Sequence, residues 1–109
     1  MISKIILADK MLEIAGNPWD PIDVMKVNDQ VVRLALCQGE YHWHQHANED
    51  ELFYVLKGEL IIQMKEEANL TLQEGELAVI PKAIEHCPKS EGDTYILMFE
   101  PYVLQSRGD

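Results

Sequence analysis

The 109-residue chain carries 19 acidic side chains against nine basic ones, which gives a formal net charge of −10. This charge argues against nucleic acid or an anionic membrane as a partner, because both bind clustered lysine and arginine. No apolar run approaches the roughly 18 residues of a membrane span. Hydrophobic residues make up 47% of the sequence and charged residues 26%, as in ordinary globular proteins.

The cellular setting follows from the N-terminus and the cysteines. A charge appears already at Lys4, too early for a secretory signal, so we expect a cytoplasmic protein. Two cysteines, Cys37 and Cys87, do not make a disulfide framework, and we expect both thiols to be reduced. The length suits one domain over residues 1–109, with residues 1–29 as a segment that packs against the rest.

The first predicted element is a short helix over residues 8–15, with Asp9 as a candidate cap. Gly16-Asn17-Pro18 would end it. Pro18 and Pro21 then predict an irregular segment around Trp19. Helical structure is therefore expected only near the N-terminus.

The remainder of the chain has the pattern of short strands. We expect turns at residues 57–59, 73–76 and 90–93, where glycine and charged residues interrupt the apolar runs. Strands at this spacing favour an all-β antiparallel sandwich or barrel. The predicted strands cover residues 31–37, 52–56, 60–64, 70–72, 77–80 and 95–99.

Alternation along these strands predicts their two faces. One set of side chains is expected to line the barrel or form the core, and the apolar pocket they imply would accept a small, partly hydrophobic molecule. The other set is too apolar to remain exposed, so either the segment around Trp19 or a second subunit should cover it. The first set is Leu34, Leu36, Phe53, Val55, Ile62 and Met64, and the second is Tyr41, Trp43, Leu52, Tyr54 and Leu56.

All four histidines fall in two places, and three of them alternate at His42, His44 and His46. Alternate strand residues share a face, but the first and third lie about 13 Å apart, too far to bind one ion. The residues alone therefore leave two pairs open, His42 with His44 or His44 with His46. Glu51 shares its strand parity with Phe53 and should face the interior beside them, with residues 47–50 as the turn between two antiparallel strands. His86 could add a ligand from across the barrel.

Two motifs resemble those of the cupin superfamily. Gly39-x4-His44-x-His46-x4-Glu51-x6-Gly58 is similar to its first motif, and Gly75-x5-Pro81-x-Ala83-x2-His86 to its second. The resemblance covers about residues 30–100 and is most evident with small, single-domain cupins. It implies a double-stranded β-helix, the cupin jelly-roll barrel, with a short N-terminal helix or irregular segment.

By position, the resemblance places the metal ligands on His44, His46, Glu51 and His86, and leaves His42 at the rim or behind the ligands. Three departures concern the turns. Four residues, rather than five, separate Gly39 from His44, Ala83 stands where the family usually has glycine, and Ser90 replaces an asparagine. A positive φ at Ala83 would be costly.

Such a site would hold one divalent transition metal, Fe, Mn, Ni, Co, Cu or Zn. With a small molecule in the barrel it would support dioxygenase chemistry or Lewis-acid isomerase chemistry. Glu51 is the candidate base, and Tyr41 and His42 are candidates for proton handling at the rim. The alternative is a non-catalytic cupin that binds or senses a small molecule or metal. Because small cupins generally pair through apolar sheet faces, the resemblance also implies a homodimer.

Overall fold

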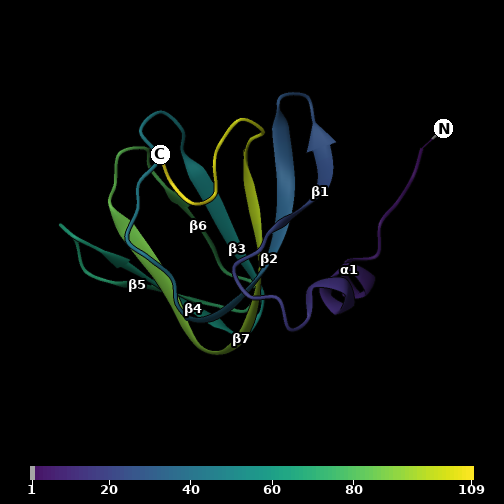
Figure 1. The fold of residues 1–109 in the computed structure, drawn as a ribbon, viewed down its shortest axis with the longest axis horizontal. Coiled ribbons are helices and arrows are strands. Elements are labelled where there is room, and N and C mark those ends of the chain that lie inside the picture. The colour runs from purple at the N-terminus through teal and green to yellow at the C-terminus, as the bar shows by residue number, and fades with distance from the viewer. Residues whose placement is uncertain (1) are drawn as a thin grey trace.

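The computed structural model describes residues 2–109, which form one helix and seven strands. The strands make a single antiparallel sheet in the order β1-β2-β7-β3-β6, and β4 pairs with both β5 and β7. Figure 1 shows the sheet curled into an open barrel with the helix outside it. The predicted all-β jelly-roll class is confirmed. The elements are α1 (Leu7–Ile14), β1 (Ile22–Val27), β2 (Gln30–Glu40), β3 (Glu51–Lys57), β4 (Glu59–Met64), β5 (Leu70–Gln73), β6 (Leu77–Ile80) and β7 (His86–Pro101).

Strand β7 joins the whole barrel, because it pairs with β2, β3 and β4. It runs as one bent strand, so the turn predicted at residues 90–93 is wrong (Figure 1). A register shift between Cys37 and Gly39 of β2 lets the paired strands bend together. A hydrogen bond between the Ser90 and Thr94 hydroxyls, which lie 2.6 Å apart, joins the two sides of the bend.

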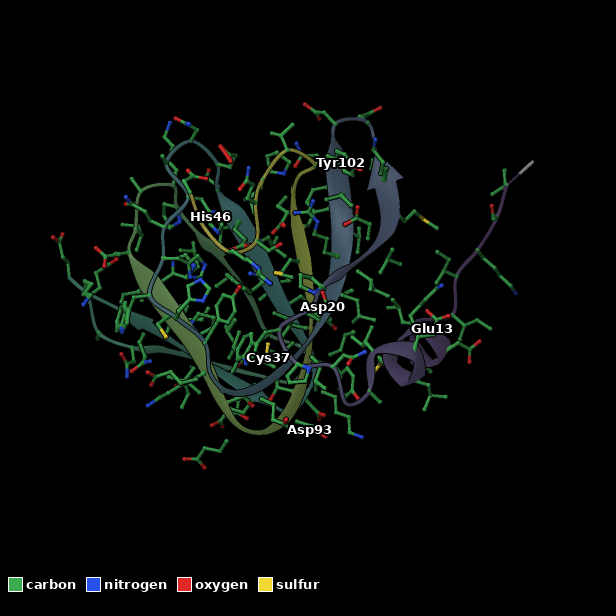
Figure 2. The ribbon with its side chains drawn as sticks, in the orientation of Figure 1. Glu13, Asp20, Cys37, His46, Asp93 and Tyr102 are labelled. Atoms are coloured by element: carbon green, nitrogen blue, oxygen red, sulfur yellow. The ribbon has the colours of Figure 1, made fainter. Side chains whose placement is uncertain are left out.

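The barrel interior is packed with apolar side chains from six strands. Phe53, Val55 and Ile62 lie there as predicted, and Met64 packs against them. Ala35 and Cys37 supply the inward face of β2, whereas Leu34 and Leu36 are buried, as predicted, in a core cluster outside the barrel. Figure 2 shows Cys37 among the side chains that fill the barrel, and His46 near its upper end.

Leu34 and Leu36 instead face outward, beneath helix α1. They form a second cluster with Ile14, and Met11 and Leu56 pack against it. Both faces of β2 are therefore buried, which is why apolar alternation could not distinguish inside from outside. The helix, rather than the segment around Trp19, covers this part of the outer face.

The predicted short helix is present as α1, but its predicted cap is wrong, because the helix begins after Ile6 and Asp9 lies in its first turn without capping it. Residues 22–27 form strand β1, which was not predicted as a strand, and pair with β2 across the turn at Asn28 and Asp29. Within residues 2–109 no helix is long and apolar enough to cross a membrane.

Candidate metal centre

Three separate parts of the chain bring four side chains to one end of the barrel. His44 and His46 lie in the connection between β2 and β3, Glu51 is the first residue of β3, and His86 is the first residue of β7. Each offers one ligand atom, and these atoms all lie within 4.8 Å of one another. The predicted set of candidate ligands is thus brought together, and such a cluster could hold one metal ion.

Backbone pairing fixes the two distant parts against each other. The His44 N–H donates to the His86 carbonyl at 3.0 Å, and the His86 N–H donates back at 2.9 Å. The Ala83 N–H donates to the His46 carbonyl at 2.7 Å. The expectation of two paired strands joined by a turn at 47–50 is wrong, because β2 and β3 each pair with β7 instead.

The ligand atoms lack other partners. His46 Nε2 lies 3.4 Å from Glu51 Oε1, and His86 Nε2 lies 3.8 Å from the same oxygen. Within residues 2–109 none of these three buried atoms has a hydrogen-bond partner, and His46 Nδ1 has none either. Leaving such groups unpaired costs about 1–3 kcal/mol each, so the donor set fits a cation that would satisfy them.

Backbone carbonyls select the tautomers of two imidazoles. His44 Nδ1 lies 3.0 Å from the His42 carbonyl, and His86 Nδ1 lies 2.8 Å from the Ile84 carbonyl. Because a carbonyl oxygen only accepts, Nδ1 carries the proton in both rings and Nε2 keeps its lone pair. Both rings are therefore oriented as metal ligands usually are.

Burial keeps His44 neutral. It lowers the pKa of His44 to about 4. The nearby His86 and His46 lower this pKa further, whereas the hydrogen bond to the His42 carbonyl raises it. A neutral imidazole is the form that binds a metal. Near pH 7 His44 is therefore ready to coordinate without losing a proton.

A second carboxyl group, which was not predicted from the sequence, lies near Glu51 and affects its pKa. Glu100, on β7, lies near enough to Glu51 for each carboxyl group to shift the pKa of the other, and it accepts a 2.6 Å bond from Arg33 Nη1. Burial and Glu51 raise the pKa of Glu100 to about 9, although Arg33 opposes them. Burial would also raise the pKa of Glu51, but His46, His86 and Glu100 outweigh it and hold that pKa below its usual range. Near neutral pH Glu100 is therefore protonated, and Glu51 keeps the charge.

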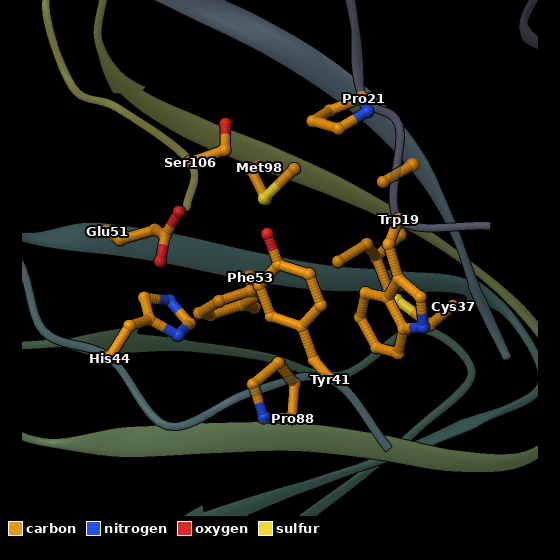
Figure 3. A pocket seen from close by; sticks show the side chains of 12 residues that line it. Trp19, Pro21, Cys37, Tyr41, His44, Glu51, Phe53, Pro88, Met98 and Ser106 are labelled. Atoms are coloured by element: carbon orange, nitrogen blue, oxygen red, sulfur yellow. The ribbon is translucent and has the colours of Figure 1, made fainter. Parts of the chain in front are cut away.

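An apolar pocket adjoins the candidate ligands (Figure 3). His44 and Glu51 lie at one side of it, and Trp19 and Cys37 at the other, with Tyr41 between them. The Tyr41 ring stacks on Trp19 with centroids 4.7 Å apart and meets His44 edge-on at 5.4 Å. Burial raises the pKa of Tyr41 despite the nearby charge of Arg107, so its hydroxyl stays protonated near neutral pH.

His42 lies outside the four-residue cluster. Its ring is exposed, and Nε2 lies 2.9 Å from the Arg107 carbonyl. Ser106, from the same C-terminal segment, lines the pocket (Figure 3). This segment has no periodic pattern in the sequence, and its place beside the ligands comes only from the structure.

Comparison with known proteins identifies the family. Residues 29–102 match the family described as Cupin domain, and the chain belongs to that family. It is 43% identical over 77 residues to the uncharacterized protein YdbB of Bacillus subtilis, across 71% of this chain and 68% of that one.

Two solved structures have similar folds. A cupin-2 domain containing protein from Shewanella frigidimarina has 38% identity and a TM-score of 0.83, over 89% of this chain and 93% of that one. Protein NMB1881 from Neisseria meningitidis has 26% identity and a TM-score of 0.83, over 91% and 99%. These neighbours share the small jelly-roll barrel.

Proposed function

We propose that the chain binds one divalent transition metal through His44, His46, Glu51 and His86, and acts on a small organic molecule beside it. One observation carries this proposal: the buried Nε2 atoms of His46 and His86 face Glu51 Oε1, and within residues 2–109 all three lack other partners. Three imidazoles and a carboxylate suit Fe, Mn, Ni, Co, Cu or Zn and leave one or two positions for a ligand.

A bound ion would supply Lewis acidity toward a carbonyl or enediol oxygen or, if redox-active, a means of oxidising the molecule with O2. The residues divide the remaining work. Phe53 and Met98 give the pocket apolar walls, which would strengthen electrostatic interactions beside a bound molecule. The protonated Tyr41 hydroxyl is placed to donate a hydrogen bond to a ligand oxygen. The low pKa of Glu51 suits a metal ligand better than a general base.

The second candidate function is non-catalytic binding of a metal or small molecule. The size of the pocket favours it, because only about 30 Å³ is open to a water-sized molecule in this conformation. An engineered apolar cavity that binds benzene is about 150 Å³. A protein that only binds a metal needs no larger pocket.

Metal analysis of protein purified without a histidine tag tests the proposal. We expect about one transition metal ion per chain, and loss of that metal in His44→Ala and His86→Ala. Unchanged metal content in both variants would show that the ligand assignment is wrong. Oxygen uptake with a panel of enediols and 1,3-dicarbonyls, measured for the Fe and Mn forms, then separates oxidative chemistry from binding alone.

We also propose that the chain forms a homodimer through the outer face of the sheet. Leu77 and Val79 of β6 are more than half exposed, and Phe99 of β7 is 38% exposed. Val79 and Phe99 both pair with Leu52, so these side chains form one apolar area of the kind that partners cover. Val79→Asp should yield monomers in light scattering, whereas Val103→Asp, on the C-terminal segment, should not.

The cytoplasm is the compartment we propose. Cys37 and Cys87 are both buried and unpaired, which agrees with a reducing environment. Burial raises the pKa of both thiols, so they are protonated and unreactive at neutral pH. Thiol titration of the native protein should therefore be slow, and titration after unfolding should find two free groups.

A further inference from the structure

The last residues of the chain, Leu104–Asp109, cross the mouth of the barrel beside the candidate ligands; we call them the strap. Arg33 holds its beginning by donating to the Leu104 carbonyl at 2.8 Å, and Leu104 is buried. Its end is held by Asp109, whose N–H donates to the Gln45 carbonyl at 3.1 Å and whose carboxylate accepts from the Ala47 N–H. Between these points only Ser106 lines the pocket.

The pocket must widen before an organic molecule of benzene's size can lie beside the ligands, since its 30 Å³ is about a fifth of the roughly 150 Å³ of an engineered cavity that binds benzene. Most of its walls cannot easily move. Phe53 and Met98 lie on strands that pair with each other, and Trp19 is fixed by 2.8 Å bonds from its backbone N–H and its indole N–H. A wall built on paired strands opens only at the expense of the sheet.

The strap is held far less firmly. It contains no strand or helix, and its bonds to the ligand loop at His42, Gln45 and Ala47 are exposed to solvent. Exposed hydrogen bonds of this kind contribute little net free energy and open readily. Movement of residues 105–109 would withdraw Ser106 from the pocket while Arg33 kept Leu104 in place.

From this contrast we propose that the strap is the movable wall of the pocket and that Ser106 sets the size of the ligand admitted beside Glu51. The proposal rests on the proposed metal centre. Small ligands should reach the ion past the closed strap, whereas larger planar chelators should have to wait for it to open. Asp109 then controls the rate of opening, because its bonds join the strap to the loop that carries His44 and His46.

The cobalt form of the protein provides a readout that does not depend on activity, because visible absorption bands change when a ligand binds the ion. We would measure the association rates of azide, as the small probe, and tropolone, as the larger planar chelator. Asp109→Ala should speed tropolone binding about fivefold by removing one exposed hydrogen bond, and leave azide within about twofold. Ser106→Trp should slow tropolone and spare azide.

Val103→Ala is the matched control, because Val103 immediately precedes the strap and is 78% exposed. It should bind both probes as the wild type does. Equal effects of Asp109→Ala on azide and tropolone, or no effect on either, would overturn the strap proposal while leaving the metal centre intact. A wild-type protein that takes up no cobalt would overturn the metal centre and the strap with it, and the absorption spectrum alone would reveal this.

Discussion

His46 Nε2 lies 3.4 Å from Glu51 Oε1 in the buried end of the barrel, and within residues 2–109 neither atom has a hydrogen-bond partner. An arrangement of this kind lowers the stability of the metal-free protein, because both groups have lost their bonds to water. A cation placed between them would restore those interactions. The relationship therefore joins metal binding to stability.

We accordingly expect metal to stabilise the fold. At a free metal concentration about 100 times Kd, the free energy of unfolding should rise by about 2.7 kcal/mol. For a domain of this size the melting temperature should increase by about 10 °C. Thermal unfolding with and without Zn²⁺ measures this difference, and a chelator should reverse it. A melting temperature that neither Zn²⁺ nor the chelator changes would argue against a metal site.

Substitution of a metal ligand should lower the metal affinity much more than substitution of His42 at the rim. His86→Ala should weaken metal binding by more than about 100-fold, beyond the range found for residues that only support a ligand. His42→Ala is the control, because its exposed ring lies outside the four-residue cluster and bonds to the Arg107 carbonyl. Competition with a metal-binding dye measures both affinities. Equal losses in the two variants would place His42 among the ligands.

The metal-free protein should lose stability in mild acid through His44. The unfolded chain takes up a proton at this residue below about pH 6.5, whereas folded His44 does so only near its pKa of about 4. Stability therefore falls as the pH drops from about 6.5 to about 4. Because His44 is only half-buried, solvent screening reduces the loss to about 2 kcal/mol. Urea unfolding at pH 7 and pH 5 should show a smaller loss in His44→Gln than in the wild type.

The free energy of unfolding of Glu100→Gln should increasingly exceed that of the wild type as the pH rises. The pKa of Glu100 is raised to about 9, so the stability it contributes is complete below the unfolded value near 4.5 and is lost as the pH rises toward 9. Glutamine stays neutral, accepts from Arg33 and donates to Glu51. We expect similar stabilities at pH 5 and an advantage of about 2 kcal/mol for the variant at pH 8.5.

Glu100→Ala provides the contrast, because it leaves Arg33 without its buried partner. It should lower the free energy of unfolding by about 3 kcal/mol at both pH values. If Glu100→Gln and Glu100→Ala behaved alike at pH 8.5, the raised pKa of Glu100 would not be the reason for the effect. Urea unfolding of the metal-free proteins provides the comparison.

Ala83 has a φ of 66°, in the left-handed region that an alanine enters only at a cost. Ala83→Gly removes that strain, worth about 1–2 kcal/mol, and loses about 0.4–1 kcal/mol because the unfolded chain becomes more flexible. A net gain of about 0.5 kcal/mol is expected. Ala78→Gly, on strand β6, is the control and should destabilise the protein by a similar amount. Denaturant unfolding with both variants measures the difference.

The candidate ligands could be predicted because their spacing is local and distinctive. His44, His46 and Glu51 fall within eight residues, and His86 follows Pro81 in a second motif. The inward face of Glu51 followed from its parity with Phe53 and Val55, and the structure confirms it. These predictions use only residues that are close in sequence, and the alternation of side chains along a strand then gives the face on which each one lies.

The supporting residues could not be predicted, because their partners are distant in sequence. Glu100 stands alone between Phe99 and Pro101, and only the fold places Arg33 against it. Strand β1 was missed since a bulge between Asp23 and Met25 breaks its alternation. Catalytic roles for Glu51, Tyr41 and His42, and the homodimer, stay predictions.

The bend of β7 has a mechanical consequence. A straight strand of its 16 residues would be about 50 Å long. Yet His86, at its first position, and Glu100, one residue before its last, both reach the Glu51 side chain. An ion bound by both His86 and Glu51 would thus hold the two ends of the bent strand close to each other. Opening of the barrel should then release the ion, so that metal retention during unfolding reports on whether the two ends of β7 are still together.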